Sequence, residues 1–225
     1  MPLRPRIDHH HSPARRAALA KGCAGLAALC LFGANQSARA AGDGYDWLEP
    51  ARNTSVAAGQ VEVIEFFWYG CPHCYQLEPS MEAWLAEKPE GVVFKRVAPP
   101  LNPSWENHAR AFYAAEALGV TETLHEPLFE ALHKQRRKLR GKDELADFAG
   151  SLGIDRDKFR KTMDSFAVQG QLKRAMQLAR SYQLEGVPAV AINGKYKTSG
   201  SLAGSYPRMM GIVDQLAREE LAGGQ

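Results

Sequence analysis

The chain has 225 residues, of which 45% are hydrophobic and 24% charged, which is ordinary for a globular protein able to bury a core. Its formal net charge of +3 depends on the N-terminus. Residues 1–40 hold six Lys/Arg and one Asp, so the remaining chain carries 22 Lys/Arg against 24 Asp/Glu, a net charge of −2. This balance excludes a globally basic protein and gives no support for nucleic-acid binding.

Residues 1–40 have the three parts of a secretory signal peptide. Basic residues come first, an apolar run covers residues 26–32, and Ala38-Arg39-Ala40 supplies a small-residue cleavage site. The apolar run is too short to span a bilayer. We therefore expect cleavage after Ala40, export of the remaining chain and no stable membrane insertion. The Sec and Tat export routes both stay open.

The first part of the exported chain predicts a strand–helix–strand unit. After a polar lead-in anchored by Tyr45, Trp47 and Leu48, an apolar run rich in β-branched and aromatic residues predicts a strand buried on both faces. Apolar residues at helical spacing follow it, and a second strand comes next. A right-handed crossover is expected for such a βαβ unit. The predicted elements are a strand over 61–67, a helix over 75–86 and a strand over 92–97.

The middle of the chain predicts helices without strands. Ser104 and Asp155 are candidate N-caps, and Gly119 and Gly153 are positioned to end helices. A block of helices between the two halves of an α/β unit is typical of an inserted domain. The predicted helices cover 105–118, 121–139, 143–152, a segment starting near 158, and 165–184.

The C-terminal part returns to strands. A short apolar strand over 187–192 is followed by Asn193-Gly194, a strong two-residue hairpin turn, and by a returning strand over 195–198. An amphipathic helix over 207–221 ends the chain. The predicted fold class is α/β, a mixed sheet with an inserted all-helical domain. Its sheet domain covers 41–103 and 186–225, and its insertion covers 104–185.

Four cysteines occur, and only Cys71 and Cys74 lie outside the predicted signal. An exported protein with a single Cys-x-x-Cys pair is not a disulfide-stapled scaffold. Closing so short a loop also adds little stability. A closed zinc site needs four ligands, and the histidines of the exported chain are scattered. The pair therefore predicts redox chemistry without a metal or a cofactor, with a structural disulfide as the alternative.

The position of the pair favours a reactive thiolate. Cys71 lies where a strand ends and a helix begins, and Pro72 fits the first helical turn. Unpaired backbone N–H groups and the helix dipole there favour a thiolate. Cys71 is therefore the predicted nucleophile and the more buried Cys74 the resolving thiol, and His73 adds a donor or positive charge. A depressed pKa at Cys71 stabilises the reduced form by about 1.4 kcal/mol per unit, so the predicted enzyme is an oxidant.

Four segments of the chain carry a resemblance to a known family. They are Glu65-Phe66-Phe67, Cys71-Pro72-His73-Cys74-Tyr75-Gln76, Gly186-Val187-Pro188 and Asn193-Gly194-Lys195-Tyr196. In these segments the chain resembles the DsbA family of periplasmic thiol:disulfide interchange proteins. The resemblance implies a thioredoxin-like mixed sheet with a helical insertion, and an enzyme that donates its disulfide to newly exported proteins. It further implies a monomer in the periplasm that a DsbB-type membrane quinone reductase reoxidises.

The same resemblance assigns roles to residues outside the dithiol. Val187-Pro188 is implied to be a cis-proline turn beside the dithiol, with the backbone of Val187 pairing with an extended substrate. Glu65, a carboxylate within an apolar strand, is implied to tune the dithiol and to assist proton transfer to Cys74. Burial of Glu65 requires a partner or a proton. Lys95 and Arg96 are both candidate partners, and Glu78 is expected to join them.

The basic run over 134–140 is interpreted as a solvated helix end rather than a binding surface. The alternative functions are a disulfide isomerase or reductase of the same fold, and a folding chaperone or binding module in which the disulfide is structural.

Overall fold

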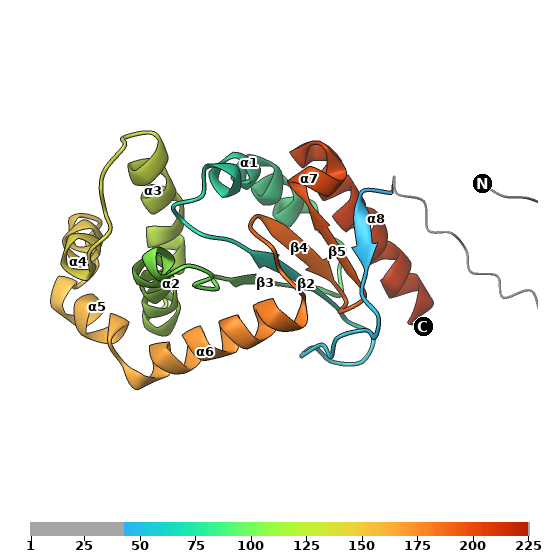
Figure 1. Ribbon diagram of the computed structural model, residues 1–225, viewed down its shortest axis with the longest axis horizontal. Helices are drawn as coiled ribbons and strands as arrows, with labels where there is room; N and C mark the ends of the chain where they lie inside the picture. The colour runs from blue at the N-terminus through green and yellow to red at the C-terminus, as the bar shows by residue number, and fades with distance from the viewer. Residues whose placement is uncertain (1–42, 225) are drawn as a thin grey trace, which may run out of the picture. The chain divides into compact units, whose positions relative to one another are not determined.

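Five strands form one mixed sheet within residues 43–224, the part of the chain that the computed structural model describes (Figure 1). The strand order is β1-β5-β4-β2-β3, with β2 and β3 parallel and every other neighbouring pair antiparallel. The predicted mixed sheet is thereby confirmed, whereas the predicted signal peptide and its cleavage site lie outside the described residues. The strands are β1 (Tyr45–Trp47), β2 (Val61–Phe66), β3 (Val92–Val97), β4 (Ala189–Ile192) and β5 (Tyr196–Ser199).

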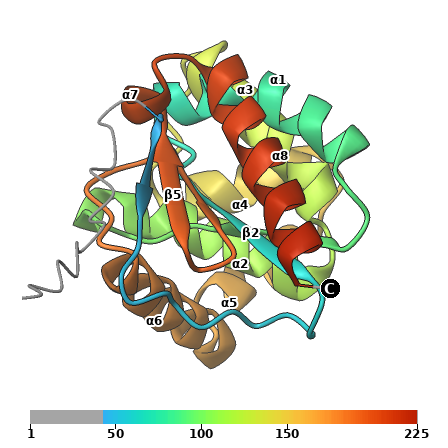
Figure 2. The same ribbon diagram turned by 90° about the vertical axis from the view of Figure 1, so that its right-hand side faces the viewer.

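The central strand β2 is buried at all six positions, as its continuous apolar character predicts. Helices cover both faces of the sheet (Figure 2). On one face, Val63 packs with Leu77 and Met81 of α1 (Pro72–Glu87) and with α8 (Tyr206–Gly223). On the other face, Phe66 packs against Tyr182, with ring centroids 5.4 Å apart, at the end of α6 (Phe166–Ser181).

The predicted hairpin is confirmed between β4 and β5. Asn193 and Gly194 have φ of 48° and 68°, the left-handed conformations that a two-residue hairpin turn requires. The carbonyl oxygen of Gly194 accepts a hydrogen bond from the backbone N–H of Arg52 at 2.7 Å. A side chain at Gly194 would overlap the carbonyl oxygen of Arg52. Glycine at this turn therefore allows the N-terminal segment to pass close to the hairpin.

Helices joined by loops, with no strand among them, make up the segment between β3 and β4, as predicted (Figure 1). Asp155 and Ser165 cap their helices by accepting hydrogen bonds from Lys158 N and Val168 N. The assignment of residues 104–185 to a separate domain stays a prediction. The elements are η1 (Pro103–Trp105), α2 (Glu106–Leu118), α3 (Thr121–His133), α4 (Lys142–Ser151), α5 (Arg156–Met163) and α6. Their buried core includes Phe112, Phe129, Leu145, Phe159, Val168 and Leu172.

Two details of the helical prediction are wrong. Helix α3 ends at His133 and does not continue to Leu139, because Arg136 adopts a left-handed φ of 56° and Leu139 turns inward to become buried. Ser104 is not the helix cap. Asn102 has that role instead, since its side chain accepts from Ser104 N and begins the short η1 that precedes α2.

Besides η1, two short elements were not predicted. Strand β1 pairs with β5 through Tyr45 and Thr198, and α7 (Gly200–Ala203) follows β5 directly. Both are too short to give a periodic sequence signal. Within residues 43–224, none of the helices has the length and apolar character needed to cross a membrane.

Candidate active site

The two cysteines lie at the start of α1, directly after the carboxyl end of β2. Cys71 is the N-cap residue, with extended φ and ψ of −87° and 117°, and Pro72 is the first helical residue. The backbone N–H of Cys71 donates to the carbonyl oxygen of Trp68, and the N–H of Tyr75 donates to that of Cys71. These contacts hold the thiol of Cys71 at the positive end of the helix.

The two thiols have opposite environments. Both are free cysteines in the structure, and Cys71 is 7% exposed whereas Cys74 is fully buried. Hydrogen bonding from the Cys74 thiol lowers the pKa of Cys71 to about 6. The backbone N–H groups of Cys74 and His73 and the charge of His73 add to this effect, and burial opposes it. Burial, together with the neighbouring Cys71, raises the pKa of Cys74 far above its ordinary value. At neutral pH the pair is therefore a thiolate at Cys71 and a thiol at Cys74.

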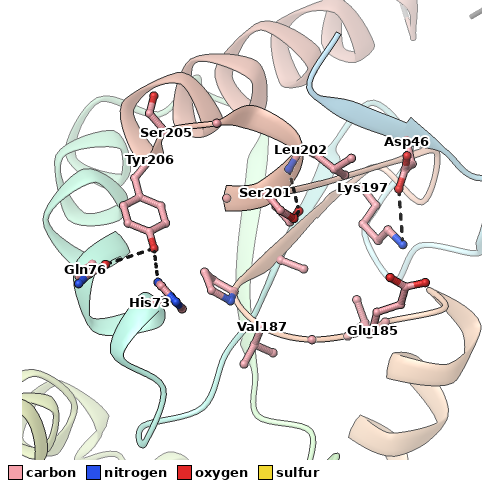
Figure 3. A pocket seen from close by; sticks show the side chains of 17 residues that line it. Asp46, His73, Gln76, Glu185, Val187, Lys197, Ser201, Leu202, Ser205 and Tyr206 are labelled. Atoms are coloured by element: carbon pink, nitrogen blue, oxygen red, sulfur yellow. Dashed lines mark hydrogen bonds and ion pairs between the residues drawn. The ribbon is translucent and has the colours of Figure 1, made fainter. Parts of the chain in front are cut away.

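The turn that precedes β4 lies against the dithiol. The peptide bond between Val187 and Pro188 is cis, and the carbonyl oxygen of Val187 lies 3.5 Å from the Sγ of Cys71. Val187 and Pro188 line a pocket of about 640 Å³, which His73 and Gln76 of α1 also line (Figure 3). The structure thus brings Cys71 and Val187 together across more than a hundred residues of sequence.

His73 has a partner that the sequence did not reveal. Its Nδ1 lies 3.0 Å from the hydroxyl of Tyr206, and that hydroxyl also donates to Gln76 Oε1 at 3.4 Å (Figure 3). Burial and the two nearby thiols raise the pKa of Tyr206. Tyr206 begins α8, so this contact links the two helices on one face of the sheet beside the dithiol.

Arg96 is the partner of Glu65, which decides between the two candidate basic residues. Glu65 and Arg96 are register partners on the parallel strands β2 and β3, so their side chains lie on the same face. Arg96 Nε lies 3.0 Å from Glu65 Oε2. Lys95 lies on the opposite face and binds Glu62 at 2.7 Å. As expected, Glu78 joins the cluster, at 3.5 Å from Arg96 Nη2.

The two buried carboxyl groups beside Arg96 have pKa values close to neutral pH. Burial first, and the charge of Glu78 second, raise the pKa of Glu65 to about 7, although Arg96 opposes the shift. Burial likewise raises the pKa of Glu78 to about 7. The charge of Glu65 also contributes to the raised pKa of Cys74. A carboxyl group that can take or release a proton at neutral pH therefore acts on the buried thiol.

A second buried histidine borders this cluster and was not singled out from the sequence. His125 of α3 lies 3.3 Å from Glu78 through Nε2, and its Nδ1 lies 3.0 Å from the hydroxyl of Tyr69. Burial, and next the charge of Arg96, lower the pKa of His125 to about 4, so the ring is neutral at physiological pH. Its position on a helix gave no local motif that could have identified it.

The described residues provide no metal site. Among residues 43–224, no group of three or more His, Cys, Asp or Glu side chains is arranged to hold a metal ion. The chemistry available at the site is that of one thiolate, one thiol and nearby carboxyl groups.

Comparison with known proteins gives one family. A family model described as a DSBA-like thioredoxin domain matches residues 87–207. "Thiol:disulfide interchange protein DsbA" of Burkholderia cepacia is 40% identical over 195 residues, which cover 87% of this chain and 92% of that protein. The protein of the same name from Azotobacter vinelandii is 41% identical, with 79% and 83% covered.

Solved structures give the same result. The crystal structure of Pseudomonas aeruginosa DsbA is similar with a TM-score of 0.76 at 38% identity, covering 80% of this chain and 93% of that one. The oxidoreductase DsbA from Xylella fastidiosa has a TM-score of 0.73 at 31% identity, with 79% and 95% covered. The thioredoxin-like fold expected from the sequence is confirmed.

Proposed function

This chain belongs to the DsbA family of thiol:disulfide oxidoreductases, and from that premise we propose that it donates its Cys71–Cys74 disulfide to newly exported periplasmic proteins. The observation that carries the direction of the reaction is the contrast between the two thiols, a pKa of about 6 at Cys71 and a strongly raised pKa at Cys74.

The reaction consists of two thiol–disulfide exchanges. A substrate thiolate attacks Cys71 Sγ, the Cys71–Cys74 bond breaks, and Cys74 leaves and takes up a proton. A second substrate thiolate then attacks the substrate sulfur of the mixed disulfide, and Cys71 leaves as a thiolate. The substrate loses two electrons and the enzyme gains them. The low pKa of Cys71 makes it a good leaving group in the second step.

Glu65 is proposed to donate the proton that Cys74 takes up and to accept it again when Cys74 releases it. Its pKa of about 7 lets it hold either state at neutral pH, and its charge acts on Cys74. Pro72 and His73 tune the Cys71 thiolate, through the helix start and through the ring charge respectively. Val187 and Pro188 form the wall on which an extended substrate segment lies, as the carbonyl oxygen of Val187 at 3.5 Å from Cys71 Sγ supports.

We further propose that the protein acts in the periplasm and is reoxidised there by a membrane partner. The signal-like N-terminus supports export with cleavage after Ala40, and the family supports a monomer in the periplasm. Reoxidation of the reduced pair by a DsbB-type membrane quinone reductase would complete the cycle. No cofactor is required, because the electrons pass between sulfur atoms.

The test is the redox equilibrium of the purified protein with glutathione. We expect the protein to remain reduced in glutathione mixtures that oxidise ordinary protein dithiols, because the Cys71 thiolate stabilises the reduced form. A strongly reducing potential would contradict the oxidant and favour the isomerase or reductase alternative. Promotion of substrate folding that persists after both thiols are alkylated would favour the chaperone alternative.

The pH dependence of stability provides an independent prediction. The folded pKa of Cys71, about 6, lies below its ordinary value of 9.0, so thiolate stabilisation is lost as pH falls through 6 and grows as pH rises toward 9. Between pH 5 and pH 8, the free energy of unfolding of the reduced protein should gain about 2.5 kcal/mol on that of the oxidised protein. Urea unfolding of both forms measures the difference, and an unchanged difference would contradict the low pKa.

A further inference from the structure

A basic groove borders the dithiol on the side of Pro72. It has a volume of about 540 Å³, and its lining includes Trp68, Gly70 and Pro72, together with the loop over 136–140. The pocket that contains Val187 is lined by His73 and not by Pro72. The residues between the two cysteines therefore separate two hollows. The proposed reaction uses only the pocket that contains Val187.

The loop over 136–140 presents cations whose side chains form no ion pairs within the described residues. Arg136, Arg137, Lys138 and Arg140 are exposed, and none has an ion pair with a carboxylate within residues 43–224. Arg137 lies over the ring of Phe148, with its guanidinium carbon 4.9 Å from the ring centroid. The groove lining contains no aspartate or glutamate. The lining of the groove is therefore positively charged, and the Glu144 carboxylate, which accepts from the backbone N–H of Arg140, lies outside it.

The loop is held in place, although it has no regular secondary structure. Leu139 is buried in the helical core, and its carbonyl oxygen lies 2.7 Å from His108 Nε2. Asn107 donates to the carbonyl oxygen of Arg140 at 2.9 Å, and the carboxylate of Glu144 accepts from the N–H of Arg140 at 2.8 Å. A fixed loop presents its cations without the entropic cost of ordering the backbone when a partner binds.

The wall of the groove is aromatic and carries an unpaired donor. Trp68 stacks on Trp105 with ring centroids 4.5 Å apart and planes 7° apart. The buried indole Nε1–H of Trp68 has no acceptor within the described residues. A side chain on Gly70 would overlap the indole of Trp68, so glycine is needed for the ring to lie there. The indole of Trp68 therefore gives the groove an aromatic wall beside the cations of the loop.

The opposite charge occurs at a separate hollow between α1 and α3. That hollow, of about 650 Å³, has Arg96 and His125 in its wall and is otherwise marked by acidic side chains. Charge around the site is therefore segregated, with cations beside Pro72 and anions along α1 and α3. The acidic side chains that line it are Glu78, Glu82, Glu122, Glu126 and Glu130.

We propose that the groove formed by Trp68 and the loop over 136–140 binds an acidic segment that lies close to the reactive cysteine of the reduced polypeptide substrate. The inference rests on the proposed function and adds a preference for substrates. An extended segment advances ~3.3 Å per residue, so residues a few positions from a cysteine bonded to Cys71 reach a groove that borders Pro72. Complementary charge at such a rim raises the association rate more than it slows dissociation.

The experiment measures the oxidation of three dithiol peptides that differ only in the residues flanking one cysteine. These flanking residues are glutamate in the first peptide, glutamine in the second and lysine in the third. With the oxidised protein in excess, we expect the order glutamate, glutamine, lysine in kcat/KM at low salt. The double variant Arg136→Gln, Lys138→Gln should lower the value for the glutamate peptide about three- to tenfold and leave the glutamine peptide unchanged. The preference should fade near 0.5 M salt.

The matched control is Lys158→Gln, Lys161→Gln on α5, which removes two exposed cations that do not line the groove. It should retain the full preference. Equal rates for the three peptides, or the same loss in the control variant, would overturn the inference while oxidation itself continued. Failure to oxidise any of the peptides would instead contradict the proposed function. Binding to anionic phosphatidylglycerol vesicles that requires Arg136 and Lys138, without a peptide preference, would assign the groove to membranes and also overturn the inference.

Discussion

Replacing Cys71 with serine should reduce the oxidation of reduced polypeptides to the uncatalysed background. Serine keeps the size of the side chain and removes the sulfur that the substrate thiolate attacks. Cys74 cannot take over, because it is fully buried and its pKa is strongly raised. The measurement is the rate at which a reduced, unfolded substrate regains its disulfide in the presence of excess variant. A rate equal to that of the wild-type protein would show that the mechanism is wrong.

The matched variant is Cys74→Ser, which leaves the nucleophile Cys71 in place. With an activated substrate disulfide, it should form a mixed disulfide at Cys71 that persists, because the resolving thiol is missing. Cys71→Ser should form none. Mass spectrometry of the trapped species therefore separates loss of chemistry from loss of folding. A complex trapped by Cys71→Ser instead would exchange the roles of the two cysteines.

Replacing Arg96 with methionine should destabilise the oxidised protein by about 3–5 kcal/mol at pH 8. The change leaves Glu65 and Glu78 buried beside one another without the cation that lies 3.0 Å and 3.5 Å from them. Both carboxyl groups already have a pKa of about 7, above the ordinary value. Groups with raised folded pKa values lose stability as pH increases, so the cost should be smaller at pH 5, where both are protonated. Urea unfolding at the two pH values measures it.

Lys95→Met is the matched control, on the next residue of the same strand. Lys95 is 37% exposed, and its partner Glu62 keeps hydrogen bonds from Ser55 N and Oγ. Lys95→Met should lower the free energy of unfolding by at most about 1 kcal/mol. Adding Glu65→Gln to the Arg96 variant should restore part of the stability at pH 8. Equal costs for the two single variants would contradict the assignment of Arg96 to the buried acids.

The sequence predicted the elements that have a strong local pattern and missed those that depend on distant contacts. The run over 61–67 predicted β2 because burial on both faces leaves few polar residues. The partner of Glu65 depends on the register of β2 with β3, which no local pattern fixes. The end of α3 depends on Leu139 finding a place in the helical core.

The candidate site divides in the same way. The position of Cys71 at a helix start follows from the strand, the glycine and the proline around it. The contact of Tyr206 with His73 joins residues 133 positions apart, and the contact of His125 with Tyr69 joins residues 56 apart. Neither pair has a motif of its own, so only the fold could reveal them.

Helix α6 lies at the boundary between two of the three hydrophobic cores within residues 43–224, the helical core and the one on the Phe66 face of the sheet. Its first half places Val168 and Leu172 in the helical core, whereas Leu178 packs on the sheet beside Phe66. A helix is a rigid unit whose hydrogen bonds form cooperatively. Loosening one core therefore removes contacts from the same helix that stabilises the other. The consequence is coupled unfolding, in which the helical insertion and the sheet that carries the dithiol lose their structure as one cooperative system.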